Sequence, residues 1–321
     1  MIVVILGRYL LNPEKIMRGV KIIRKLIFLV LRFTLIPFFI REIIQRKKVT
    51  IILYHNIKPN TLDMHFKVLN SKYNIITLKN FLEARISGKV NDLPPKSLII
   101  TLDDGYKENY KLKTILKKYN MRPTIFLCGG IVGTKRHFWD GEDCVSNNRD
   151  YLKTISNKKR LEFLREFGFE EEKEFGDRVA LSNNEIEELK DIVDFQSHSM
   201  FHPVLPNCSC ERAYNEISQS KKYLEHNYGF EIYALSYPNG NYSDREISMA
   251  KKAGYACGIT VDVGFNSQNT DIFRLKRMSI ADDADINELL VKACGLWWYI
   301  RKIFDYTSQL HKLSIFKNEV F

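Results

Sequence analysis

Residues 49–293 alternate between short apolar runs and amphipathic stretches, and this alternation limits the fold more than any other feature. The runs are rich in Val, Ile and aromatic residues, which is typical of strands buried on both faces. The expected strands are 49–54, 75–77, 97–102, 123–128, 193–196, 233–237, 256–261 and 274–280. The expected helices are 64–70, 78–87, 106–119, 152–174, 186–190, 211–228, 243–253 and 285–293, and Ser182 and Glu185 have the spacing of a capping box in front of 186–190. Repeated strand–helix units predict an α/β fold with a parallel sheet, open or closed into a barrel.

Polar clusters follow four of the expected strands directly. They are His55, the pair Asp103 and Asp104, the pair His198 and His202, and Asn239 with Asn241. In parallel α/β folds, catalytic groups collect at the carboxyl ends of the strands. Carboxylates and imidazoles together are ligands for a divalent metal, and a spare carboxylate beside them can serve as a base. The pattern predicts a metal-dependent hydrolase of amides or esters.

The net charge of +11 belongs to the two ends of the chain. Residues 1–50 hold eleven Lys and Arg against two Glu, and residues 296–321 hold four against two acids, which leaves 51–295 neutral. A nucleic-acid-binding domain needs a basic face with interleaved aromatic residues, so no nucleic-acid partner is expected. The six Cys form no CxxC pair, which indicates unpaired thiols in a reducing compartment.

The basic N-terminal segment is expected to lie on a membrane surface. Residues 26–40 are strongly apolar but contain Arg32, Thr34 and Pro37, with basic residues on both sides. A spanning helix needs about 20 apolar residues, and a cation at the bilayer centre is costly, so an interfacial amphipathic helix fits better. Residues 296–302 combine Trp, Tyr and cations in a similar way. The alternatives are two helices that pack on the core, or an uncleaved signal anchor.

The motifs resemble those of the polysaccharide deacetylases, the NodB-homology hydrolases of carbohydrate esterase family 4. Residues 101–105 (TLDDG) match the family's TFDDG motif with Leu for Phe, and 198–202 (HSMFH) match H(S/T)xxH. Residues 237–240 (YPNG) resemble its third motif. Residues 53–57 and 274–280 resemble the branch with the poly-N-acetylglucosamine deacetylases. The resemblance spans roughly 50–290 and implies a distorted, incomplete (β/α) barrel.

The resemblance also implies roles for the polar residues. Asp104, His198 and His202 would bind the divalent metal, with Zn²⁺ as the default and Co²⁺, Ni²⁺ or Fe²⁺ as alternatives. Asp103 would be the general base for a metal-activated water, and the backbone N–H of Asn239 would stabilise the oxyanion.

Two features of the family motifs are missing. Ser236 stands near the place of the third-motif Arg, and residues 227–310 contain no His to act as the family's C-terminal acid. His55 is predicted as the substitute acid, with a buried, hydrogen-bonded His as the alternative. Tyr106 and Trp139 are predicted to contact substrate, although Trp139 fits a packing role almost equally well.

The predicted activity is removal of N-acetyl groups from an amino sugar in a glycan or a lipid-linked glycan. The expected location is the cytoplasmic face of the cytoplasmic membrane, and an enzyme anchored to face the cell envelope is the alternative. A non-catalytic carbohydrate-binding or membrane-scaffold protein is the competing class. The predicted parts are a membrane-associating segment (1–48), a catalytic domain (49–293) and an aromatic, basic C-terminal helix (294–321).

Overall fold

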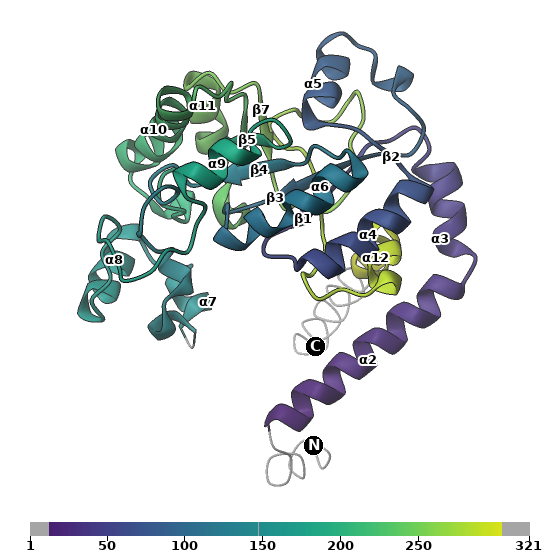
Figure 1. Ribbon diagram of the computed structural model, residues 1–321, viewed down its shortest axis with the longest axis horizontal. Coiled ribbons are helices and arrows are strands. Elements are labelled where there is room, and N and C mark those ends of the chain that lie inside the picture. Colours follow the sequence, from purple (N-terminus) through teal and green to yellow (C-terminus); the bar gives the residue numbers. More distant parts are fainter. Residues whose placement is uncertain (1–12, 147, 304–321) are drawn as a thin grey trace, which may run out of the picture. The chain divides into compact units, whose positions relative to one another are not determined.

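The computed structural model describes residues 13–146 and 148–303 (Figure 1). The outer parts of both predicted terminal segments, 1–12 and 304–321, lie outside the described residues. The chain forms two compact units. The larger is Gln45–Asp283, and the smaller combines Met1–Ile44 with Ala284–Phe321.

The larger unit is built on an eight-stranded parallel sheet. The strands are β1 (Thr50–Tyr54), β2 (Asn74–Ile75), β3 (Ser97–Leu102), β4 (Thr124–Leu127), β5 (Asp194–Ser197), β6 (Ala234–Ser236), β7 (Cys257–Ile259) and β8 (Met278–Ser279). They lie in the order β7-β6-β5-β4-β3-β1-β8, with β2 beside β3. The segment before β8 approaches both edges, because Leu275 bridges to Ile259 of β7 while β8 pairs with β1. The sheet therefore curls into an incomplete (β/α) barrel, which confirms the predicted fold class.

Helices surround these strands (Figure 1). They are α4 (Pro59–Lys72), α5 (Leu78–Ile86), α6 (Lys113–Tyr119), α7 (Arg149–Leu152), α8 (Asn157–Glu166), α9 (Asn183–Leu189), α10 (Cys210–Tyr228) and α11 (Asp244–Lys252). Three of them begin with a capping box, in which an N-cap hydroxyl and a side chain three residues later satisfy each other's backbone N–H. The box at Ser182 and Glu185 confirms the predicted start of α9.

Two predicted helices differ from the structure. The first half of 106–119 is a 3-10 turn (Lys107–Leu112), and α6 begins only at Lys113. The charged run 152–174 is not one helix but the end of α7, then α8, then an irregular segment. The break has a local cause, because the Ser156 hydroxyl accepts the N–H of Lys159 and so starts a new helix.

The smaller unit contains α2 (Pro13–Phe33), α3 (Ile36–Phe39), a π-helical turn (Ile40–Ile44) and α12 (Ile286–Ala293), followed by a helical stretch over 296–303. Helix α2 packs along α12. The rings of Phe28 and Trp297 lie 5.0 Å apart, and Arg24 forms a 2.6 Å ion pair with Glu288. Within the described residues, no helix has both the length and the apolar character needed to cross a membrane.

Candidate active site

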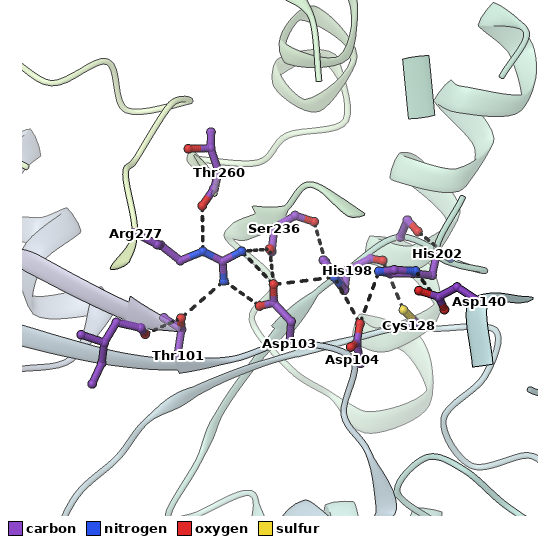
Figure 2. Close-up of polar contacts among 12 residues, drawn as sticks. Thr101, Asp103, Asp104, Cys128, Asp140, His198, His202, Ser236, Thr260 and Arg277 are labelled. Atoms are coloured by element: carbon purple, nitrogen blue, oxygen red, sulfur yellow. Dashed lines mark hydrogen bonds and ion pairs between the residues drawn. The ribbon is translucent and has the colours of Figure 1, made fainter. Parts of the chain in front are cut away.

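The site forms where the parallel strands end, because their register places successive polar residues side by side. Tyr54 pairs with Leu102, so the next residues, His55 and Asp103, are neighbours at the carboxyl end of β1 and β3. Strand β5 delivers His198 in the same way. In Figure 2 the side chains of Asp103, Asp104, His198 and His202 point toward one another.

Three of these residues form a cluster with metal-ligand chemistry. Oδ1 of Asp104 lies 3.4 Å from Nε2 of His198 and 3.4 Å from Nε2 of His202. All three residues are buried, and Asp104 Oδ1 has no hydrogen-bond partner among the described residues. Two ligand atoms about 2.0–2.2 Å from a tetrahedral cation are roughly 3.3–3.5 Å apart. The observed spacing and the unsatisfied oxygen therefore fit a bound divalent cation.

Neighbouring groups orient the two imidazoles. Nδ1 of His198 lies 2.8 Å from the backbone carbonyl oxygen of Ser236, which accepts the ring N–H and leaves the Nε2 lone pair facing Asp104. Nδ1 of His202 is buried without a hydrogen-bond partner in the described part of the chain, and Oδ1 of Asp140 lies 4.0 Å from it. A carboxylate near the second nitrogen of a ligating His is a common outer partner.

The turn that carries the imidazoles is held in an unusual backbone conformation. Ser199 and His202 have φ of +68° and +57°, and Asp104 has +75°. Positive φ costs free energy for residues with a side chain, so the surroundings must hold this conformation. The carboxylate of Glu216 in α10 does so by accepting the backbone N–H groups of Met200 and Phe201, each at 2.9 Å.

Arg277 is the functional residue that the sequence reasoning missed. Its guanidinium donates to both carboxylate oxygens of Asp103 at 2.7 Å, and Nε donates to the carbonyl of Thr260 at 2.7 Å (Figure 2). The hydroxyl of Ser236 also donates to Asp103, at 3.2 Å. The absence of an Arg near Ser236 is thus compensated from a different segment. Its signal was an Arg inside a predicted buried strand, 274–280, because such a cation needs a buried carboxylate.

Burial and neighbouring charges determine which side chains of the site are protonated. Burial alone would raise the pKa of Asp103, but Arg277 and His198 outweigh it and hold the pKa below its ordinary value. Burial likewise opposes ionisation of Asp104, and His202 and His198 keep its pKa well below the usual range. Burial and then the Asp104 charge raise the pKa of Tyr106 far above normal. Both carboxylates are therefore ionised at neutral pH and the Tyr106 phenol keeps its proton.

The predicted acid, His55, lies beside these carboxylates. Its positive form lowers the pKa of both Asp103 and Asp104, so the ring is within electrostatic reach of them. Its backbone N–H donates to Asp282 at 3.2 Å, and its carbonyl accepts from Asn109 at 3.0 Å. The main chain is therefore held, and His55 as a whole is half-buried.

Asn239 lies in the turn after β6 with φ of +56°. Its side-chain Nδ2 is buried and has no hydrogen-bond partner among the described residues. An unsatisfied buried donor is costly unless something else accepts from it. The residue is thus placed and equipped for a polar contact with a bound molecule.

Trp139 does not lie as a sugar platform. Only 2% of its surface is exposed, the Arg160 guanidinium lies 4.4 Å from its ring centroid, and its indole N–H donates to the His202 carbonyl at 2.8 Å. It belongs to an apolar cluster with Val145, Leu164 and other buried residues. The packing alternative describes the structure, because a buried ring has no face for a sugar, and Trp139 instead supports the turn that carries His202.

This arrangement agrees with comparisons to known proteins. The sequence profile of the polysaccharide deacetylases matches residues 90–258, slightly more than half of the chain. The chain belongs to the polysaccharide deacetylase family. Homologues in the family are hydrolases that act on carbon–nitrogen bonds.

Two relatives illustrate the family. The Bacillus subtilis (strain 168) protein YxkH, which is named among polysaccharide deacetylases, is 26% identical over 245 residues, covering 73% of this chain and 72% of YxkH. The poly-beta-1,6-N-acetyl-D-glucosamine N-deacetylase of Staphylococcus aureus (strain MRSA252) is 27% identical over 210 residues. That alignment covers 65% of this chain and 62% of the staphylococcal enzyme, so this chain spans less than two thirds of it.

Solved structures of family members share the fold. The Streptococcus pyogenes deacetylase PplD, in complex with acetate, has a TM-score of 0.58 at 20% identity and covers 77% of this chain and 98% of PplD. IcaB from Ammonifex degensii has a TM-score of 0.57 at 15% identity and covers 77% of this chain and 97% of IcaB. At these identities the likeness concerns the fold alone.

Proposed function

We propose that this chain is a divalent-metal-dependent hydrolase that removes N-acetyl groups from an amino sugar within a glycan. Membership of the family supports deacetylation of a polysaccharide. The observation that carries the rest is the buried cluster of Asp104, His198 and His202 next to an ionised Asp103. A ligand set and a base in one buried place are the parts that amide hydrolysis by activated water requires.

Asp104, His198 and His202 would hold the cation. When bound, the cation would act as a Lewis acid that lowers the pKa of a water molecule and polarises the acyl carbonyl. Two imidazoles and one carboxylate suit Zn²⁺, which is our first candidate, and also Co²⁺, Ni²⁺ or Fe²⁺.

Asp103 would accept the proton of the water that attacks the acetyl carbonyl. Arg277 keeps this carboxylate ionised and holds it in one orientation, with both oxygens bonded. The developing oxyanion would accept a hydrogen bond from the backbone N–H of Asn239. When the carbon–nitrogen bond breaks, the amine needs a proton, and His55 at the edge of the site is our candidate donor. The products are acetate and a free amino sugar.

The substrate is an N-acetylated glycan in one of two settings. The staphylococcal relatives are named for poly-beta-1,6-N-acetyl-D-glucosamine, which makes a polymer of N-acetylglucosamine one candidate. A lipid-linked sugar at the cytoplasmic face of a membrane is the other, and we favour it because all six Cys are unpaired and the chain ends are basic and apolar. An anchored enzyme that faces the cell envelope would instead meet the polymer.

A non-catalytic carbohydrate-binding or scaffold protein is the competing proposal. Such a protein has no need of a complete ligand set or of an ionised base. The Asp104, His198 and His202 cluster and the paired Asp103 count against it.

One experiment separates these proposals. The purified full chain is incubated with N-acetylglucosamine oligomers and with polyprenyl-linked N-acetylated sugars, and released acetate is measured. We expect acetate release that a chelator abolishes and that added Zn²⁺ or Co²⁺ restores. Release that persists after full metal removal would contradict the metal-dependent mechanism, and no release from any substrate would favour the binding protein.

A further inference from the structure

Helix α2 exposes an apolar face. Residues spaced three or four apart share one side of a helix. On α2 the outward side consists of large apolar residues with high exposed fractions. They are Ile22 (53%), Ile23 (59%), Leu26 (54%), Val30 (65%) and Phe33 (73%). A contiguous exposed apolar surface of this kind marks an interaction site.

The opposite side of α2 is turned inward, against α12. Phe28 is 3% exposed and packs on Trp297. Arg24 is bonded to Glu288, and Arg32 donates to Asn287 at 2.7 Å. The helix thus differs from an ordinary surface helix, because Arg24 and Arg32 have protein partners while large aliphatic side chains face outward, and Lys25 remains exposed.

The apolar surface continues beyond α2. Leu35 is 71% exposed, and in α3 Phe38 and Phe39 are each 52% exposed. In the following π-helical turn, Ile43 is 67% exposed. We call the outward apolar residues of 22–43 the docking face. Large exposed apolar residues thus recur along two helices and a turn, which is more than singly scattered surface residues.

The charge around the docking face identifies its partner. Residues 13–44 contain seven Lys and Arg against two Glu, a net charge of +5. A second copy of the face would bring two such charges together, which is unfavourable. Anionic lipid headgroups have the opposite charge, and their acyl chains accept apolar side chains. A membrane surface satisfies both halves of the pattern, whereas a second copy satisfies only the apolar half.

We infer that the docking face inserts into the headgroup layer of a membrane that contains anionic lipid, with α2 lying in the plane of the surface and α12 on its aqueous side. This inference does not depend on the proposed deacetylation, because it uses only residues of the smaller unit. It deepens the membrane location by naming the residues that enter the lipid.

Vesicle binding tests the inference with the full chain. Phosphatidylcholine vesicles with and without phosphatidylglycerol are sedimented with the protein. We expect binding that phosphatidylglycerol strengthens, and a loss of about tenfold or more in Phe33→Asp and in Val30→Asp. Phe167→Asp is the matched control, because Phe167 is 59% exposed in the larger unit and receives the same charge. Lys25→Glu should reduce the preference for phosphatidylglycerol.

Two further measurements complete the test. Acetate release from a water-soluble oligomer should be equal in wild type and Phe33→Asp, so that a failure of membrane docking and a failure of catalysis are told apart. Sedimentation velocity gives the oligomeric state. Wild-type protein that ignores vesicles, or an equal loss of binding in Phe33→Asp and Phe167→Asp, would overturn the inference. So would an oligomer that Phe33→Asp converts to monomers while vesicles remain unbound, because the face would then be a self-association surface.

Discussion

The interior of the larger unit and the outward face of α2 depart from the usual distribution of residues in opposite directions. The barrel end buries charged groups such as Asp103, Arg277 and His198, with 1–3% of their surfaces exposed. The docking face leaves large apolar residues such as Val30 and Phe33 mostly exposed. Folding free energy alone favours neither arrangement, because buried charges are costly to desolvate and exposed apolar groups gain nothing.

The buried charges of the barrel and the exposed apolar residues of α2 differ in where their partners lie. In the barrel the buried Asp103 is paired with Arg277 within the unit, whereas Asp104 Oδ1 has no hydrogen-bond partner among the described residues and lies where a cation fits. On α2 the inward face is satisfied by α12 and the outward face is left for a partner outside the chain. We therefore propose that the first region holds a small ion and a reacting group, and that the second meets a membrane surface.

The sharpest test of the barrel interior is the base. Asp103→Asn should retain the cation but lower the rate of acetate release by about 10²–10⁴-fold, because the neutral amide cannot accept a proton. Rates are measured by acetate release and metal content by elemental analysis. Asp143→Asn, at an exposed carboxylate, is the matched control and should be unchanged. Near-normal turnover of Asp103→Asn would exclude Asp103 as the base.

Arg277→Met tests whether Arg277 stabilises the fold through its buried ion pair with Asp103. Removal of the guanidinium leaves Asp103 buried and unpaired, so the free energy of unfolding should fall by about 3–5 kcal/mol. The same substitution in an Asp103→Asn background should cost clearly less, since no bare charge remains. The measurement is denaturant unfolding of all four proteins. Equal losses in both backgrounds would mean that Arg277 acts through packing rather than through Asp103.

Two Phe residues on α2 compare its faces directly. Phe28→Ala should destabilise the packing of α2 on α12 by about 3 kcal/mol, because a buried ring is replaced by a cavity. Phe33→Ala, at an exposed position on the same helix, should change stability by no more than about 0.5 kcal/mol. Hydrogen exchange of the α2 backbone amides measures the stability of the helix in both variants. Similar exchange in the two variants would mean that α2 has no distinct inward face.

The buried carboxyl of Glu171 should make the stability of the protein depend on pH. Its carboxylate bonds Arg212 at 2.7 Å, and burial raises its pKa from 4.5 to about 7, with Glu216 adding to the shift and Arg212 opposing it. The folded-state pKa is raised, so this contribution to stability is full below pH 4.5 and is lost as the pH rises through 7. Between these limits wild type should lose about 2–3 kcal/mol more than Glu171→Gln. Parallel pH–stability curves for the two proteins would contradict the shift.

Trp139→Phe should have the smallest effect. It removes the hydrogen bond to the His202 carbonyl, which should lower the free energy of unfolding by about 1 kcal/mol. KM for a soluble glycan should not change, because the buried ring does not reach a substrate. A raised KM with unchanged stability would restore the sugar-platform role predicted from the sequence.

Local patterns explain which parts of this protein could be predicted. The strand β3 has the predicted bounds, and α9 begins at the predicted capping box, since both depend on neighbouring residues only. The convergence of Asp104 with His198 and His202 could also be predicted, because parallel strands end at the same edge of a sheet. The helix predicted over 152–174 failed because a cap inside it outweighed the helical composition of the whole run.

The sequence by itself determined the parallel α/β architecture, the strand ends that carry the polar residues, and the basic, apolar character of the N-terminal segment. Only the tertiary structure decided that Arg277 reaches Asp103 across 174 residues, that Trp139 is enclosed, and which side of α2 faces outward. The physical reason is the range of the interactions. Periodicity and capping act between near neighbours, whereas the partner of a buried charge depends on how the curled sheet brings its last strand back beside the first.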